Sequence, residues 1–351
     1  MKKFNAAALA RENIVQLEPY SSARTEYSSR GAMLLDANEN TIGSAAGNNY
    51  NRYPDPQQQD LKKALSRIKN IGTEQIFIGN GSDEAIDILV RIFCRPGTDN
   101  MIICPPTYGM YQVAAGINDV AVRPVPLTQG FDLDAAAVCN AIDDNTRLIF
   151  ICTPGNPTGN NVDTEKIRSV AATFNGIVVI DEAYIDFSDA PSWIDQLREY
   201  PNIVVLQTLS KAWGMAALRL GMAFASTEII SLMNKVKPPY NINAASQQLA
   251  VEALSQTETI AAWTETLRQQ RTAMQQRLPG FSFVKKIYPS DANFLLVQVT
   301  DAPAVYAHLL RYGIVVRRRD TLPGCAQCLR ITIGTPEENE QLYTALETFN
   351  A

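Results

Sequence analysis

The stretch "RLIFICTPGNPTGNNVDTEKIRSVAATFNGIVVID", residues 147–181, carries the pattern that decides the fold. Near its two ends lie apolar runs, 148–152 and 177–180, that are long enough for strands and do not alternate with polar residues. Between them, residues 163–174 have the length and mixed polarity of a helix. A buried strand, a helix and a second buried strand predict a crossover unit of a parallel sheet that is covered on both faces.

The same alternation of strand and helix extends to both sides of this stretch. Further strands are predicted at "QIFIG" (75–79), "NMIICPP" (100–106), "DVAVRPVP" (119–126), "NIVVLQT" (202–208) and "LRLGMAFAS" (218–226). Helices are predicted at "DLKKALSRI" (60–68), "SDEAIDILVRIF" (82–93), "TYGMYQVAAG" (107–116) and "LDAAAVCNAI" (133–142). This alternation predicts an α/β fold with a mostly parallel central sheet flanked by helices.

The length of 351 residues exceeds the roughly 250–300 residues at which single cores stop growing. Weak periodicity makes residues 1–40 a predicted N-terminal arm, and residues 41–243 form the predicted large α/β domain. After a pair of prolines, a long linking helix is predicted at about 244–277. Short strands and helices in the rest of the sequence predict that residues 244–351 are a smaller α+β C-terminal domain.

The charge and the hydropathy pattern exclude several classes of protein. The net charge is −5 and the longest basic run, Arg317–Arg319, is short, so no nucleic-acid partner is expected. The apolar run Ala6–Ala10 is too short for a signal peptide. No apolar stretch approaches the roughly 18 residues of a membrane span, so we expect a cytoplasmic protein without a membrane partner.

Histidine and cysteine usage restricts the possible chemistry. His308 is the only histidine, which disfavours histidine-dependent triads and excludes multi-histidine metal sites. The pair Cys325 and Cys328 in "CAQC" has no second CxxC motif, so we expect reduced thiols and no metal site.

Polar motifs directly follow several predicted strands, where ligands bind in open α/β sheets. In "GNGSDEAI" (79–86), small residues let the backbone N–H groups near Ser82 and Asp83 approach an anion at a helix N-terminus. An ordinary helix cap is the alternative reading. The motif lacks the P-loop lysine and the dinucleotide fingerprint, so it favours a small phosphorylated ligand over a nucleotide.

Three other motifs place polar or aromatic groups at the same sheet edge. Asp181 ends the apolar strand of "VVIDEAY" and needs a cation, which could also be a structural arginine. Tyr184 follows closely enough to reach the same ligand. Asn156 lies in the rigid turn "CTPGNPTG", and Tyr108 in "PPTYGMY" could cover a planar ring or simply pack in the core.

Lys211 stands among small and apolar residues in "LQTLSKAWGMAALRLG" (206–221). Desolvation lowers the pKa of a lysine and makes its amine a nucleophile for an aldehyde, although a surface lysine with a buried stem is the alternative. Pyridoxal 5'-phosphate requires such an amine for its aldehyde, an acid beside its ring nitrogen, and an aromatic side chain that stacks on its ring. It also requires a binding site for its phosphate, here called the phosphate seat. Asp181 would supply the acid, and Arg219 and Ser210 would join the seat near Ser82.

These motifs, taken in order, resemble the fold-type I pyridoxal-phosphate aminotransferases and, within them, the branch that acts on histidinol phosphate. The resemblance covers nearly the whole chain, through "LEPYSSAR", "DANEN", "NRYPDP", "GNGSDEAI", "PTYGMY", "PGNPTG", "DEAY", "TLSKAWGMAALRLG", "DANFLLV" and "LRITIGTPEEN". It implies a two-domain subunit that works as a homodimer, with the active site at the subunit boundary.

The resemblance also implies roles for single residues. Lys211 would be the Schiff-base lysine, Asp181 would face the pyridine nitrogen, Asn156 and Tyr184 would bond the ring 3-oxygen, and Tyr108 would stack on the ring. The implied ligands of the cofactor phosphate are Thr208, Ser210, Arg219 and the backbone at Ser82 and Asp83, with Tyr53 reaching it from the partner subunit.

The implied substrate ligands are Tyr20, Asn156, Arg317 and Arg330, and Arg330 would also take the carboxylate of glutamate, because a guanidinium can bind either oxyanion. Arg317, Arg318 and Arg319 are consecutive, and alternation along a strand would let the first and third share a face. We favour Arg317, which stands thirteen residues before Arg330 as the family's pair does.

The resemblance implies transamination between histidinol phosphate and 2-oxoglutarate, giving imidazole-acetol phosphate and glutamate, with Lys211 as the base that moves the Cα proton. A threonine-phosphate decarboxylase or an aromatic amino acid aminotransferase on the same scaffold is the alternative, because sequence does not reveal which Cα bond breaks. A ligand-sensing domain of a transcription regulator is disfavoured, because no helix-turn-helix pattern is found.

Overall fold

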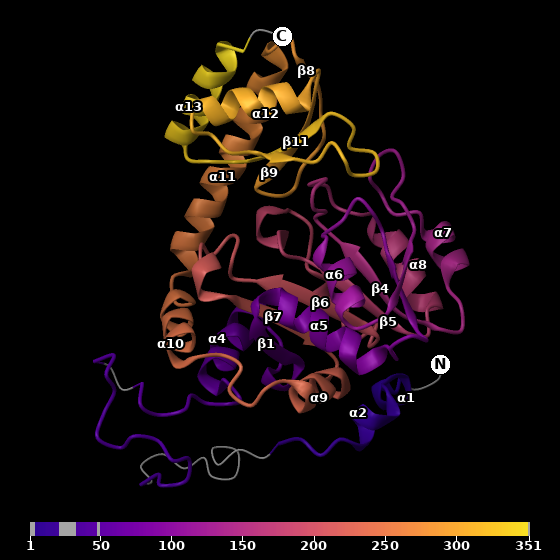
Figure 1. Ribbon diagram of the computed structural model, residues 1–351, viewed down its shortest axis with the longest axis vertical. Helices are drawn as coiled ribbons and strands as arrows, with labels where there is room; N and C mark the ends of the chain where they lie inside the picture. The colour runs from indigo at the N-terminus through magenta and orange to yellow at the C-terminus, as the bar shows by residue number, and fades with distance from the viewer. Residues whose placement is uncertain (1–3, 21–32, 48–49, 350–351) are drawn as a thin grey trace.

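The computed structural model describes residues 4–20, 33–47 and 50–349, and Figure 1 shows the course of the chain. Of the predicted N-terminal arm, residues 1–3 and 21–32 therefore lie outside the described residues. The described part of the arm contains two short helices, α1 (Ala6–Leu9) and α2 (Glu12–Gln16). Within the described chain, every helix is too short or too polar to cross a lipid bilayer.

A seven-stranded sheet with the order β1-β7-β6-β5-β4-β2-β3 forms the centre of the larger part of the molecule. Its strands are β1 (Ile76–Asn80), β2 (Asn100–Ile103), β3 (Ala121–Pro124), β4 (Thr146–Cys152), β5 (Ile177–Asp181), β6 (Ile203–Thr208) and β7 (Leu220–Ala225). Strands β3, β2, β4, β5 and β6 pair in parallel, whereas β7 is antiparallel to both β6 and β1. The expected α/β fold with a mostly parallel sheet is confirmed.

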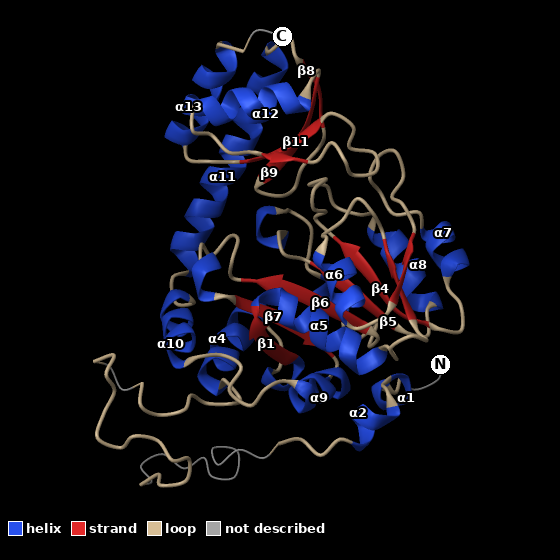
Figure 2. Ribbon diagram, viewed as in Figure 1, coloured by secondary structure: helices blue, strands red, loops and turns tan. Residues whose placement is uncertain are grey.

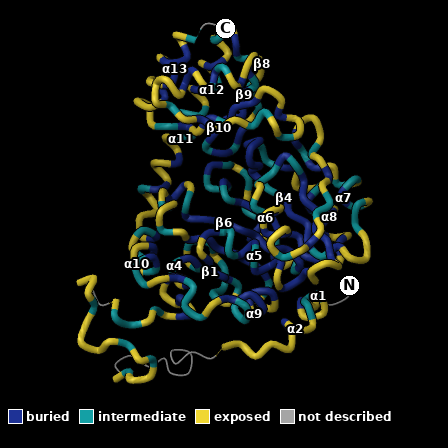
Figure 3. The backbone as a smooth tube through the Cα atoms, viewed as in Figure 1, coloured by how far each residue is buried: buried dark blue, intermediate teal, exposed yellow. Residues whose placement is uncertain are grey.

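Helices cover both faces of this sheet, as Figure 2 shows. Along β5, Val178 and Ile180 join one apolar core while Ile177 and Val179 join the other, because successive side chains of a strand point to opposite faces. The helices of this part are α4 (Gln59–Lys69), α5 (Gly81–Phe93), α6 (Met110–Ile117), α7 (Ala135–Ala141), α8 (Thr164–Thr173) and α9 (Thr227–Val236). Buried residues concentrate in the strands between these layers (Figure 3).

A four-stranded antiparallel sheet with the order β10-β11-β9-β8 lies near the C-terminus, at the other end of the view in Figure 1. Its strands are β8 (Val284–Ile287), β9 (Phe294–Val299), β10 (Arg317–Arg318) and β11 (Cys328–Thr332), and its helices are α12 (Ala302–Arg311) and α13 (Pro336–Glu347). These elements share an apolar core of their own with the end of α11. The predicted domain boundaries at residues 40 and 243 stay predictions.

The predicted linking helix at 244–277 is wrong in one respect, because it is two helices. Helix α10 (Ala244–Ala253) and helix α11 (Thr257–Arg277) are separated by a turn at 254–256. In that turn the hydroxyl of Ser255 donates to the carbonyl of Glu252 at 2.7 Å. A serine hydroxyl that bonds a nearby carbonyl competes with the helical hydrogen bond, which gives a local reason for the interruption. Short 3-10 helices lie at Thr73–Gln75, Ile185–Phe187, Trp193–Gln196, Ala216–Leu218 and Leu278–Gly280.

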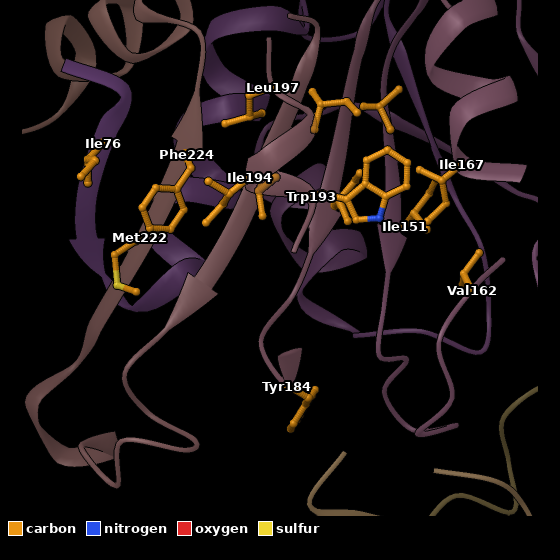
Figure 4. Close-up of a cluster of buried hydrophobic side chains, with 14 of the residues drawn as sticks. Ile76, Ile151, Val162, Ile167, Tyr184, Trp193, Ile194, Leu197, Met222 and Phe224 are labelled. Carbon is orange, nitrogen blue, oxygen red and sulfur yellow. The ribbon is translucent and has the colours of Figure 1, made fainter. Parts of the chain in front are cut away.

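One edge of the large sheet gathers the segments that the sequence singled out. Parallel pairing brings the carboxyl ends of β2, β4, β5 and β6 to this edge, and the antiparallel strand β7 contributes its amino end there. In Figure 4, Tyr184 lies apart from the other labelled side chains of the apolar cluster, on the loop after β5. The sheet thus places distant polar motifs side by side.

Candidate active site

A cavity of about 760 Å³ opens at this edge of the large sheet and reaches the small sheet. Most of the residues that the sequence singled out line it, from both parts of the molecule. They are Ser82, Asp83, Tyr108, Asn156, Asp181, Tyr184, Thr208, Ser210, Lys211, Arg219, Arg317 and Arg330. The cavity walls also include Cys152, which no sequence motif singled out, and Arg319, the alternative to the favoured Arg317.

Asp181 is a buried carboxylate on the floor of the cavity, with 2% of its surface exposed. It accepts hydrogen bonds from the Tyr111 hydroxyl at 2.6 Å and from the Ala183 N–H at 3.1 Å. Burial raises the pKa of Asp181, and these two hydrogen bonds oppose the rise. Among the described residues no cation forms an ion pair with it, so a ligand nitrogen that carries a proton would fit beside it.

Tyr111 is a residue of this site that the sequence analysis missed. It lies in the "PTYGMY" motif, three residues after Tyr108, and its ring stacks on Phe150 with centroids 4.7 Å apart. Its position one helical turn from Tyr108 was a signal that could have found it. Its buried hydroxyl fixes the orientation of the Asp181 carboxylate.

Lys211 follows β6 and points its amine into the cavity, with Nζ 5.6 Å from the centroid of the Tyr184 ring. The neighbouring small and apolar residues predicted a desolvated side chain, but Lys211 is exposed, because the loop after β6 opens directly on the cavity. Partial burial, followed by the charge of Arg330, still lowers the pKa of Lys211. The amine is therefore accessible and easier to deprotonate than an ordinary lysine.

The expected phosphate seat lies where β7 begins beside the start of α5. Gly81 has a φ of 72°, and a Cβ there would lie 2.8 Å from an Nη atom of Arg219. Arg219 itself has a φ of 55°, and its guanidinium lies 3.6 Å from the Asp83 carboxylate. The side chain of Asn80 does not cap α5, and the N–H of Gly81 donates to the carbonyl of Arg219 at 2.9 Å. The next N–H groups of the helix, those of Ser82 and Asp83, can therefore bind an anion together with the Arg219 guanidinium.

Gly221 allows the close approach of β7 to this helix start. A Cβ at this position would lie 2.1 Å from the backbone nitrogen of Ser82, and backbone atoms cannot move aside cheaply. We expect Gly221→Ala to destabilise the fold by about 1–3 kcal/mol through overpacking and to weaken anion binding at the seat. Denaturant unfolding would measure the change.

A matched control for this prediction is Gly116→Ala in α6, where an added Cβ would meet no atom within 4 Å. In a helix this change should stabilise by about 0.5–1 kcal/mol. Equal stability changes of the same sign at both positions would contradict the close-approach explanation.

Thr208 and Ser210 lie together at the end of β6. The Thr208 hydroxyl donates to the carbonyl of Leu220 at 3.0 Å and accepts from the Ser210 N–H at 3.1 Å. Its donor is therefore used within the protein, which favours a role in shaping the turn over the expected direct contact with a phosphate. The hydroxyl of Ser210 makes no hydrogen bond with any described residue and can meet an anion.

A chain of hydrogen bonds joins the two sheets across the cavity. Arg330 of β11 donates to Oδ1 of Asn156 at 2.5 Å, and Nδ2 of Asn156 donates to the Tyr184 hydroxyl at 3.3 Å. Phe294 supports both ends, because its ring lies 5.1 Å from that of Tyr184 and 5.2 Å from the Arg330 guanidinium. Asn156 and Tyr184 are thus adjacent polar groups on the cavity wall.

Tyr108 is half-buried at the mouth of the cavity. Its hydroxyl donates to Asp83 at 3.0 Å, which fixes the ring beside the expected phosphate seat. Burial raises the pKa of Tyr108, so the hydroxyl stays protonated at neutral pH. The ring is placed where it could cover a planar ligand.

Two predicted site residues lie away from the cavity of this chain. Tyr53 is half-exposed and stacks on Tyr240 with centroids 4.5 Å apart, and Tyr20 is 76% exposed. The expectation that Tyr53 serves the site of a partner subunit stays a prediction. No described contact joins either side chain to Lys211 or Arg219.

The "CAQC" pair lies outside the cavity. Cys325 and Cys328 are buried free thiols, and burial raises their pKa values to about 11 and about 12. Such thiols are poor nucleophiles near neutral pH. Among the described residues, His, Cys, Asp and Glu form no group of three or more that could hold a metal ion.

The arrangement fits a phosphorylated cofactor that carries an aldehyde and a basic ring nitrogen. Among the described residues, three groups lack a partner that such a molecule has. They are the accessible amine of Lys211, the buried carboxylate of Asp181, and the N–H groups of Ser82 and Asp83 beside Arg219. The two glycines at the seat keep free the space that side chains would fill. These are the features that pyridoxal phosphate requires.

Comparisons with known proteins agree with this geometry. A family model for class I and II aminotransferases matches residues 26–346. The histidinol-phosphate aminotransferase of Cytophaga hutchinsonii is 50% identical to this chain over 346 residues, which cover 99% of each protein.

Solved structures show the same fold at lower identity. The histidinol-phosphate aminotransferase of Sinorhizobium meliloti, in complex with pyridoxal-5'-phosphate, has a TM-score of 0.79 at 24% identity and matches 88% of each chain. The L-threonine-O-3-phosphate decarboxylase of Porphyromonas gingivalis has a TM-score of 0.74 at 21% identity, and the match covers 86% of this chain and 91% of its own. The fold alone therefore does not select the reaction.

Proposed function

The chain belongs to the class I and II aminotransferases, and we propose that it transfers the amino group of histidinol phosphate to 2-oxoglutarate. The products are imidazole-acetol phosphate and glutamate. One observation carries the proposal: the amine of Lys211 and the buried acid Asp181 line the same cavity as Arg317 and Arg330, which suit a substrate phosphate. The identity of 50% to a histidinol-phosphate aminotransferase supports the same substrate.

Pyridoxal 5'-phosphate is the proposed cofactor. When bound, it supplies an aldehyde for amines and a ring that accepts electrons as the Cα proton leaves. Arg219, Ser210 and the N–H groups at the start of α5 would hold its phosphate. Asp181 would keep its ring nitrogen protonated, and Asn156 with Tyr184 would bond the ring oxygen.

Lys211 is the proposed proton carrier. Its amine is accessible and its pKa is lowered. It can therefore take the Cα proton of the substrate and then return this proton to the carbon that carries the cofactor aldehyde. Asp181 would stabilise the positive charge on the ring nitrogen of the bound cofactor. The hydrogen bonds from Tyr111 and Ala183 keep this carboxylate in one orientation throughout.

The substrate phosphate and the carboxylate of glutamate would use the same cationic wall. Arg330 is held by Asn156 and by the ring of Phe294, so its guanidinium is already oriented for an oxyanion. Arg317 lies opposite it on β10. An oxyanion bound there fixes the reacting Cα near Lys211.

The proposed enzyme is a homodimer, in which Tyr53 and Tyr20 of one subunit complete the site of the other. Both tyrosines are exposed and remote from the cavity of their own chain, which supports this arrangement. We also propose that residues 41–243 and 244–351 are its two domains, after an arm at 1–40.

Substrate comparison tests the proposed reaction. The purified protein should show an absorbance change when histidinol phosphate is added, and 2-oxoglutarate should restore the starting spectrum. Its kcat/KM for histidinol phosphate should exceed that for phenylalanine by about a hundredfold, because the carboxylate of phenylalanine can pair with Arg330 but leaves Arg317 without an anion.

The alternatives predict different products in the same assay. An aromatic aminotransferase would favour phenylalanine, and a decarboxylase would release carbon dioxide from threonine phosphate. Either of these results, with slow turnover of histidinol phosphate, would overturn the proposed function.

A further inference from the structure

Three arginines of the small sheet line one wall of the cavity. Arg317 lies directly opposite Arg330 in the antiparallel pair of β10 and β11. Arg319 lies two residues further, where its N–H donates to the carbonyl of Cys328 at 2.9 Å, and so it shares the cavity face with Arg317. Arg318 lies outside the cavity wall and forms an ion pair with Asp320 at 2.6 Å.

Within the described part of the chain, no partner of Arg319 explains its position. Across residues 4–20, 33–47 and 50–349, no carboxylate pairs with Arg317 or Arg319, and neither guanidinium donates a side-chain hydrogen bond. The Nε atom of Arg319 is buried and lacks an acceptor among these residues. A guanidinium that is partly buried without an anion is costly, so this arrangement indicates a missing anionic ligand.

The neighbouring charges strengthen this argument. Burial, followed by the charges of Arg330 and Arg317, lowers the pKa of Arg319 to about 10. The guanidinium still carries its charge at neutral pH. Three like charges gathered around one cavity wall repel one another, and an anion placed between them would relieve the repulsion.

The charge of the candidate ligands differs. A carboxylate carries one charge on two oxygens and is satisfied by a single bidentate guanidinium, which Arg330 provides. A phosphate monoester carries up to two charges on three terminal oxygens and can use further guanidinium groups. The third arginine is therefore surplus for glutamate but suited to histidinol phosphate.

We propose that Arg319 is a substrate-binding residue that contacts the phosphate group and favours phosphate esters over carboxylate substrates. This inference rests on the proposed function. It adds Arg319 to the pair Arg317 and Arg330, and it assigns to Arg319 a role in one half-reaction only: the one in which the phosphate ester is bound.

The test compares the two half-reactions of the holoenzyme. In Arg319→Gln, kcat/KM for histidinol phosphate should fall about 10- to 100-fold, as expected for a lost hydrogen bond to a charged group, while the glutamate half-reaction stays close to wild type. Arg319→Lys keeps the charge and should recover part of the loss. The matched control Arg318→Gln, one residue away but outside the cavity, should leave both half-reactions unchanged.

A second readout does not depend on histidinol phosphate. Inorganic phosphate should inhibit the glutamate half-reaction of the wild-type holoenzyme, and Arg319→Gln should raise its inhibition constant about tenfold. Equal losses in both half-reactions, or no change in either, would overturn the role of Arg319. Failure of the wild-type protein to use histidinol phosphate would instead overturn the proposed function. Inhibition by inorganic phosphate would still test whether Arg319 binds a phosphate group together with Arg317 and Arg330.

Discussion

Lys211→Ala is expected to slow both half-reactions by at least about 10²–10⁴-fold, the contribution of a positioned general base. Lys211 is a lysine whose amine points into the cavity, and Nζ lies above the ring of Tyr184. The variant removes both the nucleophile for the cofactor aldehyde and the carrier of the Cα proton. Stopped-flow absorbance with histidinol phosphate and with glutamate would measure the two rates.

A matched control separates this effect from a general loss of charge. Lys63→Ala removes an exposed lysine that pairs with Asp60 at 3.6 Å and does not line the cavity, so it should leave both rates unchanged. Circular dichroism would check that each variant is folded. Normal turnover by folded Lys211→Ala would show that another group carries the proton.

We expect Asp181→Asn to weaken the stabilisation of the protonated ring nitrogen of the cofactor by about 3–5 kcal/mol. The reason is that the variant removes one partner of the buried ion pair that Asp181 would form with this nitrogen. At about 1.36 kcal/mol for each factor of ten, the rate should fall by about 10²–10³-fold or more. The change is nearly isosteric, so the Tyr111 hydroxyl can still donate to the amide oxygen. The fall in rate should appear in kcat of both half-reactions, because both depend on the same cofactor ring.

Glu182→Gln is the matched control for Asp181→Asn. Glu182 is the next residue and is equally buried, but it accepts hydrogen bonds from Ser192, Trp193 and Gln207 outside the cavity. Burial raises its pKa to about 7, so it is only partly ionised at neutral pH. Because Glu182 does not line the cavity, its substitution should leave the rates of both half-reactions close to wild type. Similar rate losses in both variants would show that Asp181 acts through the fold and not at the ring.

Much of the fold could be predicted because its signals are local. The apolar runs of β4 and β5 with an amphipathic segment between them specify a parallel crossover, and parallel pairing brings their carboxyl ends together. The sequence pattern alone therefore predicts Asn156 and Asp181 at one edge of the sheet. The break between α10 and α11 was missed, because the segment at 254–256 contains neither glycine nor proline.

Several features of the site depend on contacts between segments far apart in the chain. The approach of Arg219 to Gly81 requires β7 to pair with β1 across more than a hundred residues of sequence. The hydrogen bond of Arg330 to Asn156 joins two different sheets. No local pattern specifies either contact.

The amino-acid sequence by itself determined the parallel α/β sheet and the chemical groups at the ends of its strands, because hydrophobic periodicity and strand direction act over short stretches. Only the tertiary structure decided which groups share one cavity. It brought Tyr111 to Asp181, and it turned Arg319, but not Arg318, toward the cavity. The physical reason is that strand register and sheet-to-sheet packing are set by side chains that are distant in sequence.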